Sequence, residues 1–152
     1  MNDNNFFIST VRYEKVTESG FSKMVKEQYL VDALSFTEAE VRTIEELTPY
    51  IRGEFSVVQI VKPRIHDLFM TDNASADRFY KVKFAYTTTD ENTGAEKKTT
   101  HVNLVQATDF KNALANFEQG MEGCLFDFEI LSITETIIVG YYSYLAYGKP
   151  CI

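Results

Sequence analysis

The chain of 152 residues repeats itself at a spacing of 73–74 positions, and this repeat limits the folds that it can adopt. A shift of 74 places residues 30–39 on residues 104–113, and five of these ten positions are identical. Unrelated sequences of average composition would share roughly one position in ten. A shift of 73 then aligns Phe6 with Phe79. The sequence therefore predicts one structural unit used twice, in residues 6–62 and 79–135.

Each half begins with the pattern of two consecutive strands. Apolar residues alternate with polar ones in 7–13 and 80–86, which is typical of a strand with one buried face. A polar turn containing glycine follows in each half, as a hairpin connection requires. Second strands are predicted at about residues 25–33 and 99–107. Each half should therefore open with a β-hairpin.

A helix is predicted after each hairpin. Ser35 and Glu38 form an S-x-x-E capping box, in which the hydroxyl and the carboxylate satisfy backbone amides that the first turn leaves unpaired. Asp109 occupies the matching position in the second half. Pro49 should end the first helix, because proline lacks an amide hydrogen and clashes with the preceding turn. Gly120 lies near the expected end of the second helix.

The third strands, at 55–61 and 126–133, carry apolar residues on both faces, which favours a central place in a sheet. A right-handed crossover would lay each third strand beside the first strand of its half. The predicted fold is therefore an α+β single domain over residues 1–152, built from a duplicated ββαβ unit. It would have one antiparallel-rich six-stranded sheet, in the order 2-1-3-6-4-5, and two helices. Two smaller sheets packed face to face are the alternative that the pattern leaves open.

The charge and the distribution of apolar residues limit the partners and the cellular location that we expect. Its formal net charge is −7, whereas proteins that bind phosphate backbones are usually basic, so nucleic acid is not expected as a general partner. The first ten residues lack the pattern of a signal peptide, and no apolar run reaches the ~18–20 residues of a membrane helix. Two cysteines, far apart, suit a reducing compartment. We expect a cytoplasmic protein that does not enter a membrane.

Three stretches carry a resemblance to a known family: residues 27–40, EQYLVDALSFTEAE; residues 11–15, VRYEK; and residues 132–136, SITET. Over about residues 6–138 the chain is similar to a family of short uncharacterised proteins from gut anaerobes and their mobile elements. That family is a domain of unknown function, so the resemblance implies no catalytic residues. The stretch from Val139 onward has no counterpart in it.

Few residues offer catalytic or metal-binding chemistry. The chain has no phosphate-binding glycine loop, nucleophile elbow or H-E-x-x-H zinc motif. His66 precedes Asp67 without a nearby nucleophile, and His101 is expected at an ordinary surface position. Cys124 falls on Ile51 in the repeat and is expected to be a small buried hydrophobe, and Cys151 lies at the exposed terminus. We predict no catalytic residues, no cofactor, no metal and no enzyme activity.

Lysines gather on the predicted hairpins, where they could form a basic patch. They are Lys23, Lys26, Lys81, Lys83, Lys97 and Lys98. Lysine commonly blunts the edge of a sheet against aggregation, so a solvated edge is the simpler interpretation. Contact with nucleic acid or with an acidic protein is the functional alternative.

The C-terminal tail, residues 137–152, is rich in tyrosine. Tyr141, Tyr142, Tyr144 and Tyr147 exceed what the repeat should need for its own core. Tyrosine is enriched in interfaces because it combines apolar area with a polar tip. The tail is therefore a candidate interface, and a terminal strand packed on its own domain is the alternative.

These features lead to three hypotheses on function. The first is a non-enzymatic interaction or accessory protein with a protein partner, such as a second copy in a homodimer. The second is a nucleic-acid-associated accessory protein that uses the lysine-bearing hairpins. The third is a small enzyme with a site between the repeats.

Overall fold

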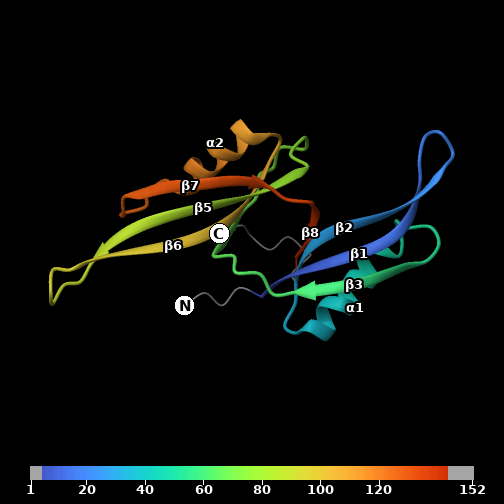
Figure 1. Ribbon diagram of the computed structural model, residues 1–152, viewed down its shortest axis with the longest axis horizontal. Coiled ribbons are helices and arrows are strands. Elements are labelled where there is room, and N and C mark those ends of the chain that lie inside the picture. Colours follow the sequence, from blue (N-terminus) through green and yellow to red (C-terminus); the bar gives the residue numbers. More distant parts are fainter. Residues whose placement is uncertain (1–4, 144–152) are drawn as a thin grey trace. The chain divides into compact units, whose positions relative to one another are not determined.

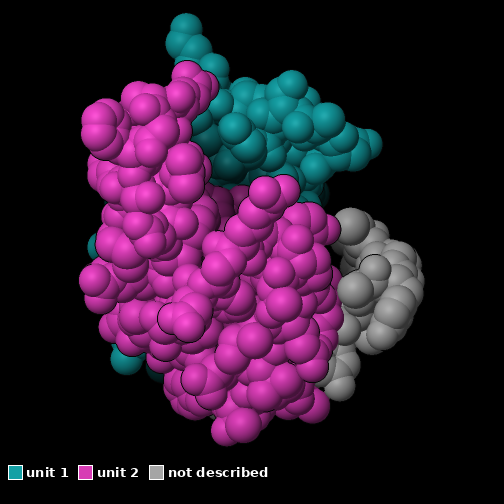
Figure 2. Space-filling view, turned by 90° about the vertical axis from the view of Figure 1, so that its right-hand side faces the viewer, with its two compact units in different colours: residues 1–4, 64–137 teal, residues 5–63, 138–152 magenta. Residues whose placement is uncertain are grey.

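The computed structural model describes residues 5–143, which form two compact units. Unit 1 consists of residues 64–137, and unit 2 of residues 5–63 together with 138–143. Figure 1 shows the elements, and Figure 2 shows the surface with the two units in different colours. Unit 1 is therefore one continuous stretch of chain, whereas unit 2 is assembled from two stretches.

Unit 2 has a four-stranded sheet in the order β3-β1-β2-β8 and one helix, α1. β1 pairs antiparallel with β2 and β3, and β8 pairs parallel with β2. The elements are β1 (Phe6–Val16), β2 (Ser22–Asp32), α1 (Phe36–Leu47), β3 (Phe55–Val61) and β8 (Ile138–Tyr142). One face of this sheet packs against α1 around Val11, Tyr29, Val31 and Leu47.

Unit 1 has the corresponding arrangement. Its sheet has the order β4-β6-β5-β7, in which β5 pairs antiparallel with β6 and β7, and β4 pairs parallel with β6. The elements are β4 (Asp67–Phe69), β5 (Arg78–Thr89), β6 (Glu96–Ala107), α2 (Phe110–Gly120) and β7 (Phe128–Glu135). Val82, Phe84, Val105 and Phe117 form the centre of the core between sheet and helix.

Both helices begin where the sequence predicts. The Ser35 side chain accepts a hydrogen bond from the Glu38 amide at 3.1 Å, and the Glu38 carboxylate accepts one from the Leu34 amide at 3.3 Å. Asp109 accepts from the Asn112 amide at 2.8 Å. The α+β class and the two helices are therefore confirmed.

The single six-stranded sheet, in the order 2-1-3-6-4-5, is wrong, because the described residues form two four-stranded sheets. β3 and β7 were expected at the centre but lie at sheet edges. The cause is a bulge: Val11 pairs with Val57 and Thr10 with Gln59, so Val58 has no partner on β1. Val57 and Ile60 consequently both pack on the helix side. Because of the bulge, a strand with one buried face has the sequence pattern of a strand that is buried on both faces.

A membrane-spanning helix was not expected from the sequence. Over residues 5–143, neither helix has the length and apolar character needed to cross a membrane.

Candidate functional site

The outer edge of β3 is the surface that most resembles a binding site. β3 lies at the end of its sheet, and its seven residues, FSVVQIV, include no charged side chain. Val58 is 45% exposed and Val61 is 40% exposed. An edge strand presents N–H and C=O groups that can pair with another strand. We call this surface the β3 edge.

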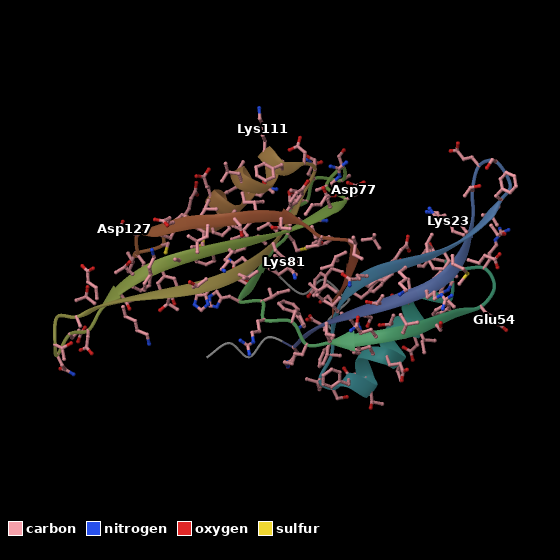
Figure 3. All side chains as sticks on the ribbon, viewed as in Figure 1. Lys23, Glu54, Asp77, Lys81, Lys111 and Asp127 are labelled. Atoms are coloured by element: carbon pink, nitrogen blue, oxygen red, sulfur yellow. The ribbon has the colours of Figure 1, made fainter. Side chains whose placement is uncertain are left out.

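The matching strand of unit 1 is better protected. β7 also lies at a sheet edge and has the same kind of bulge, which exposes Leu131. However, β7 contains Glu129 and Glu135, and Asp127 stands immediately before it (Figure 3). Charged side chains discourage edge-to-edge pairing. Of these two matching edges, only that of β3 consists entirely of uncharged residues.

Two histidines that are far apart in the sequence stack on each other in unit 1. The rings of His66 and His101 have centroids 4.1 Å apart and planes inclined by 16°. The Tyr86 hydroxyl lies 2.8 Å from Nε2 of His101. The expectation that His101 is an ordinary surface residue is therefore wrong. Sequence reasoning missed this pair because it did not predict that the segment leading into β4 lies along β6.

The histidine pair does not form a metal site in this geometry. A metal binds in the plane of an imidazole ring, so a metal held by one ring would lie off the plane of the other. In residues 5–143, no group of three or more His, Cys, Asp or Glu side chains is placed to hold a metal ion. Cys124 is exposed, so its predicted burial is wrong, and Cys151 lies outside the described residues.

The histidine pair should make unit 1 sensitive to acid. Burial, and then the neighbouring His66, lower the pKa of His101 below its usual value of 6.5. The neutral form is thus favoured in the folded state, so stability is full above about pH 6.5 and falls as the pH drops below it. We expect the unfolding free energy to decline more steeply with acid in the native chain than in His101→Gln. Urea titrations from pH 7.5 to 5 check this, and identical pH slopes would contradict it.

The two tail tyrosines that the structure describes are part of unit 2. Tyr142 stacks on Tyr29 at 5.6 Å, and the Tyr141 hydroxyl donates to Asp32 at 2.8 Å. Burial, and then the bond to Asp32, raise the pKa of Tyr141 to about 12. Both side chains therefore have contacts within their own unit. Tyr144 and Tyr147 lie outside the described residues, and an interface role for the four tyrosines stays a prediction.

A carboxylate anchors the neighbouring tyrosines. Glu27 accepts hydrogen bonds from the hydroxyls of Tyr13 at 3.0 Å and Tyr29 at 2.9 Å. Burial, and then these bonds, raise the pKa values of both phenols above the usual 10. Both tyrosines therefore stay neutral near pH 7, as the hydrogen-bond donors that Glu27 needs.

The structure gathers only some of the predicted basic patch on one face. Lys81 and Lys83 alternate along β5, and Lys98 is paired opposite Thr87, which lies on the same face. Lys97, its neighbour on β6, points to the other face. The remaining two lysines, Lys23 and Lys26, belong to unit 2. Figure 3 labels Lys23 of unit 2 and Lys81 of unit 1. All six lysines are exposed.

Comparison with known proteins identifies the family of the chain. No curated protein and no solved structure matches it. One family model covers residues 5–144, which includes every residue that the structure describes. The match extends through β8, so the expectation that the stretch from Val139 onward has no counterpart in the family is wrong. The chain belongs to the family described as a domain of unknown function, DUF4494.

Proposed function

We propose that the chain is a non-enzymatic interaction protein that associates through the β3 edge, and that its partner there is a second copy of itself. The observation that carries this proposal is an edge strand of seven uncharged residues with exposed valines at positions 58 and 61. About half of the backbone groups of such a strand point away from its neighbour β1. Pairing them with another strand would extend the sheet.

A second copy suits this edge because β3 is compatible with itself. In antiparallel self-pairing no like charges oppose each other in any register, because none of the seven residues of β3 is charged. Two-fold symmetric pairing of one surface with itself is also the commonest way in which soluble proteins assemble. A β7 edge paired with itself would instead carry Glu129 and Glu135 from both copies.

The bulge at Val58 has to be weighed against this proposal, because bulges also blunt sheet edges. The two units share the bulge, so it does not explain why their edges differ in charge. β7 combines the bulge with carboxylates, whereas β3 has only the bulge and the flanking residues Glu54 and Lys62. An edge that must stay unpaired would be expected to carry more protection.

Analytical ultracentrifugation tests the β3 edge. We expect the native chain to sediment as a dimer at high concentration and Val58→Lys to sediment as a monomer, because a charge at the centre of the paired edge faces its own copy. Leu131→Lys, which makes the same change at the matching position of β7, should still form the dimer. Hydrogen exchange of β1 and β2 verifies that Val58→Lys remains folded. A native chain that is monomeric at its highest soluble concentration would refute the proposal, as would equal effects of the two variants.

A nucleic-acid-associated function has weaker support. Lys81, Lys83 and Lys98 share one face of unit 1, but Glu129 is paired opposite Ala85 on the same face. A carboxylate among three lysines lowers the attraction for phosphate, and the whole chain is acidic. The β3 edge therefore remains the better-supported binding surface.

A further inference from the structure

The short strands β4 and β8 occupy equivalent places in the two units. Each pairs parallel with the second strand of its sheet, and the three residues 67–69 and 140–142 are separated by the same 73 positions as the rest of the repeat. Leu68 pairs with Leu104, and Tyr141 pairs with Leu30. Leu30 and Leu104 match each other in the repeat at a shift of 74. The short strands of the two units are therefore paired with equivalent residues of the second strands.

The approach to each short strand also corresponds. Ile65 and Ile138 are 73 positions apart and are 6% and 2% exposed. Ile138 pairs with Gln28, and the amide after Ile65, that of His66, donates to the carbonyl of Val102. Gln28 and Val102 match in the repeat. In each unit a buried isoleucine thus lies two residues before the three matching positions, 67–69 and 140–142, and is placed against the same position of the second strand.

The remaining register agrees between the units. The pairing of β1 with β3 shifts between Thr10 and Val11, and that of β5 with β7 shifts between Lys83 and Phe84, which are 73 positions further on. The eleven residues of β2 have the same sequence of buried and exposed positions as the first eleven of β6. The repeat therefore has five elements, ββαββ, with β4 closing the first copy and β8 closing the second.

From this we infer that the two repeats exchange their closing strands. β4 ends the first repeat in the sequence but completes the sheet of unit 1, and β8 ends the second repeat but completes unit 2. The outer edges of β2 and β6 are strand-acceptor surfaces, and their partner is the closing strand of another repeat. The chain is a strand-exchanged pair of repeats joined into one polypeptide.

The acceptor surface of unit 1 is shaped for β4. A side chain at Gly120 would meet the Phe69 ring at 2.5 Å, so this ring packs directly on the backbone at the end of α2. The same ring lies 6.0 Å from that of Phe117. In the repeat, Gly120 corresponds to Glu46, so the matching position of unit 2 carries a side chain where unit 1 has none.

The acceptor surface of unit 2 is shaped for β8 instead. Tyr29 offers a ring on which Tyr142 stacks, and Asp32 accepts the hydrogen bond of Tyr141. The matching residues of unit 1 are Asn103 and Gln106, which provide neither a ring nor a carboxylate. These differences direct each closing strand to the unit in which it is found, because a wrong placement would lose these contacts.

Cleavage of the folded chain between the repeats tests the exchange. A protease site is inserted after Asp72, in the exposed loop between β4 and β5, in a chain with Cys124→Ser and Cys151→Ser. Asp67→Cys and Asn103→Cys are added, because paired strands lie about 4.8 Å apart, within reach of a disulfide. After oxidation and cleavage, we expect the fragments 1–72 and 73–152 to migrate as one disulfide-linked product.

The control joins Asp67→Cys to Tyr29→Cys, the position that matches Asn103 in the first repeat. If β4 stays with its own repeat, this second pair forms the disulfide, and the cleaved fragments separate without reductant. Linkage of 67 with 29, or failure of 67 to link with 103, would overturn the exchange. Neither result bears on the β3 edge, which involves other residues.

Discussion

Replacing Phe117 with alanine should lower the unfolding free energy of unit 1 by about 3–5 kcal/mol, the usual cost of removing a buried aromatic ring. Phe117 is 0% exposed, and its ring centroid lies 5.2 Å from that of Phe84 and 5.8 Å from that of Phe128. It therefore joins α2 to two strands of the sheet, and its removal leaves a cavity between them. Hydrogen exchange with mass spectrometry measures the loss in peptides from β5 and β6.

Phe110→Ala is the matched control, because it removes the same ring from the same helix at a position that is 54% exposed. Its effect should be clearly smaller than that of Phe117→Ala. Similar losses of protection in the two variants would show that the packing of Phe117 is not what holds α2 on the sheet.

Leu47→Ala should lower the unfolding free energy of unit 2 by about 2–5 kcal/mol, the range measured for buried leucines. Leu47 is 2% exposed at the end of α1 and packs among Val11, Tyr29 and Val31. Without it, α1 loses its contact with the centre of the sheet. The loss should be read from hydrogen exchange in β1 and β2.

Val41→Ala provides the comparison for Leu47, since Val41 lies on the same helix and is 49% exposed. We expect it to change protection little. If Leu47→Ala leaves β1 and β2 as protected as the native chain does, the core of unit 2 is not centred where the structure places it.

The parts of the fold that depend on neighbouring residues were predictable from the sequence. The helix starts follow from Ser35, Glu38 and Asp109, whose side chains bond within their own first turn. The β-hairpins follow from alternation and turn residues, which also act over a few positions. These signals need no knowledge of the rest of the chain.

The sheet order could not be predicted in the same way. The bulge at Val58 shifts the alternation of β3 by one residue, so a strand with one buried face resembles a buried central strand. β4 has only three residues, too few for a periodic pattern, and its partner β6 lies more than thirty positions away. The order of apolar and polar residues along the chain does not reveal either feature.

The candidate surfaces, too, could be predicted only as far as neighbouring residues determine them. That β3 lacks charge is visible in the sequence, but it becomes informative only once β3 is known to be an edge strand. The stack of His66 on His101 depends on β4 joining the sheet of unit 1, which the sequence did not predict. The tail tyrosines were recognised as unusual, and the structure gives Tyr141 and Tyr142 partners that the sequence could not name.

Cysteine cross-linking in β3 tests the proposed self-association most directly. In a chain with Cys124→Ser and Cys151→Ser, Val58→Cys places one thiol at the centre of the β3 edge, and Leu131→Cys places one at the matching position of β7. Under mild oxidation, the account predicts a covalent dimer from Val58→Cys that forms much faster than any from Leu131→Cys. Equal rates for the two variants, or no dimer from Val58→Cys, would contradict it.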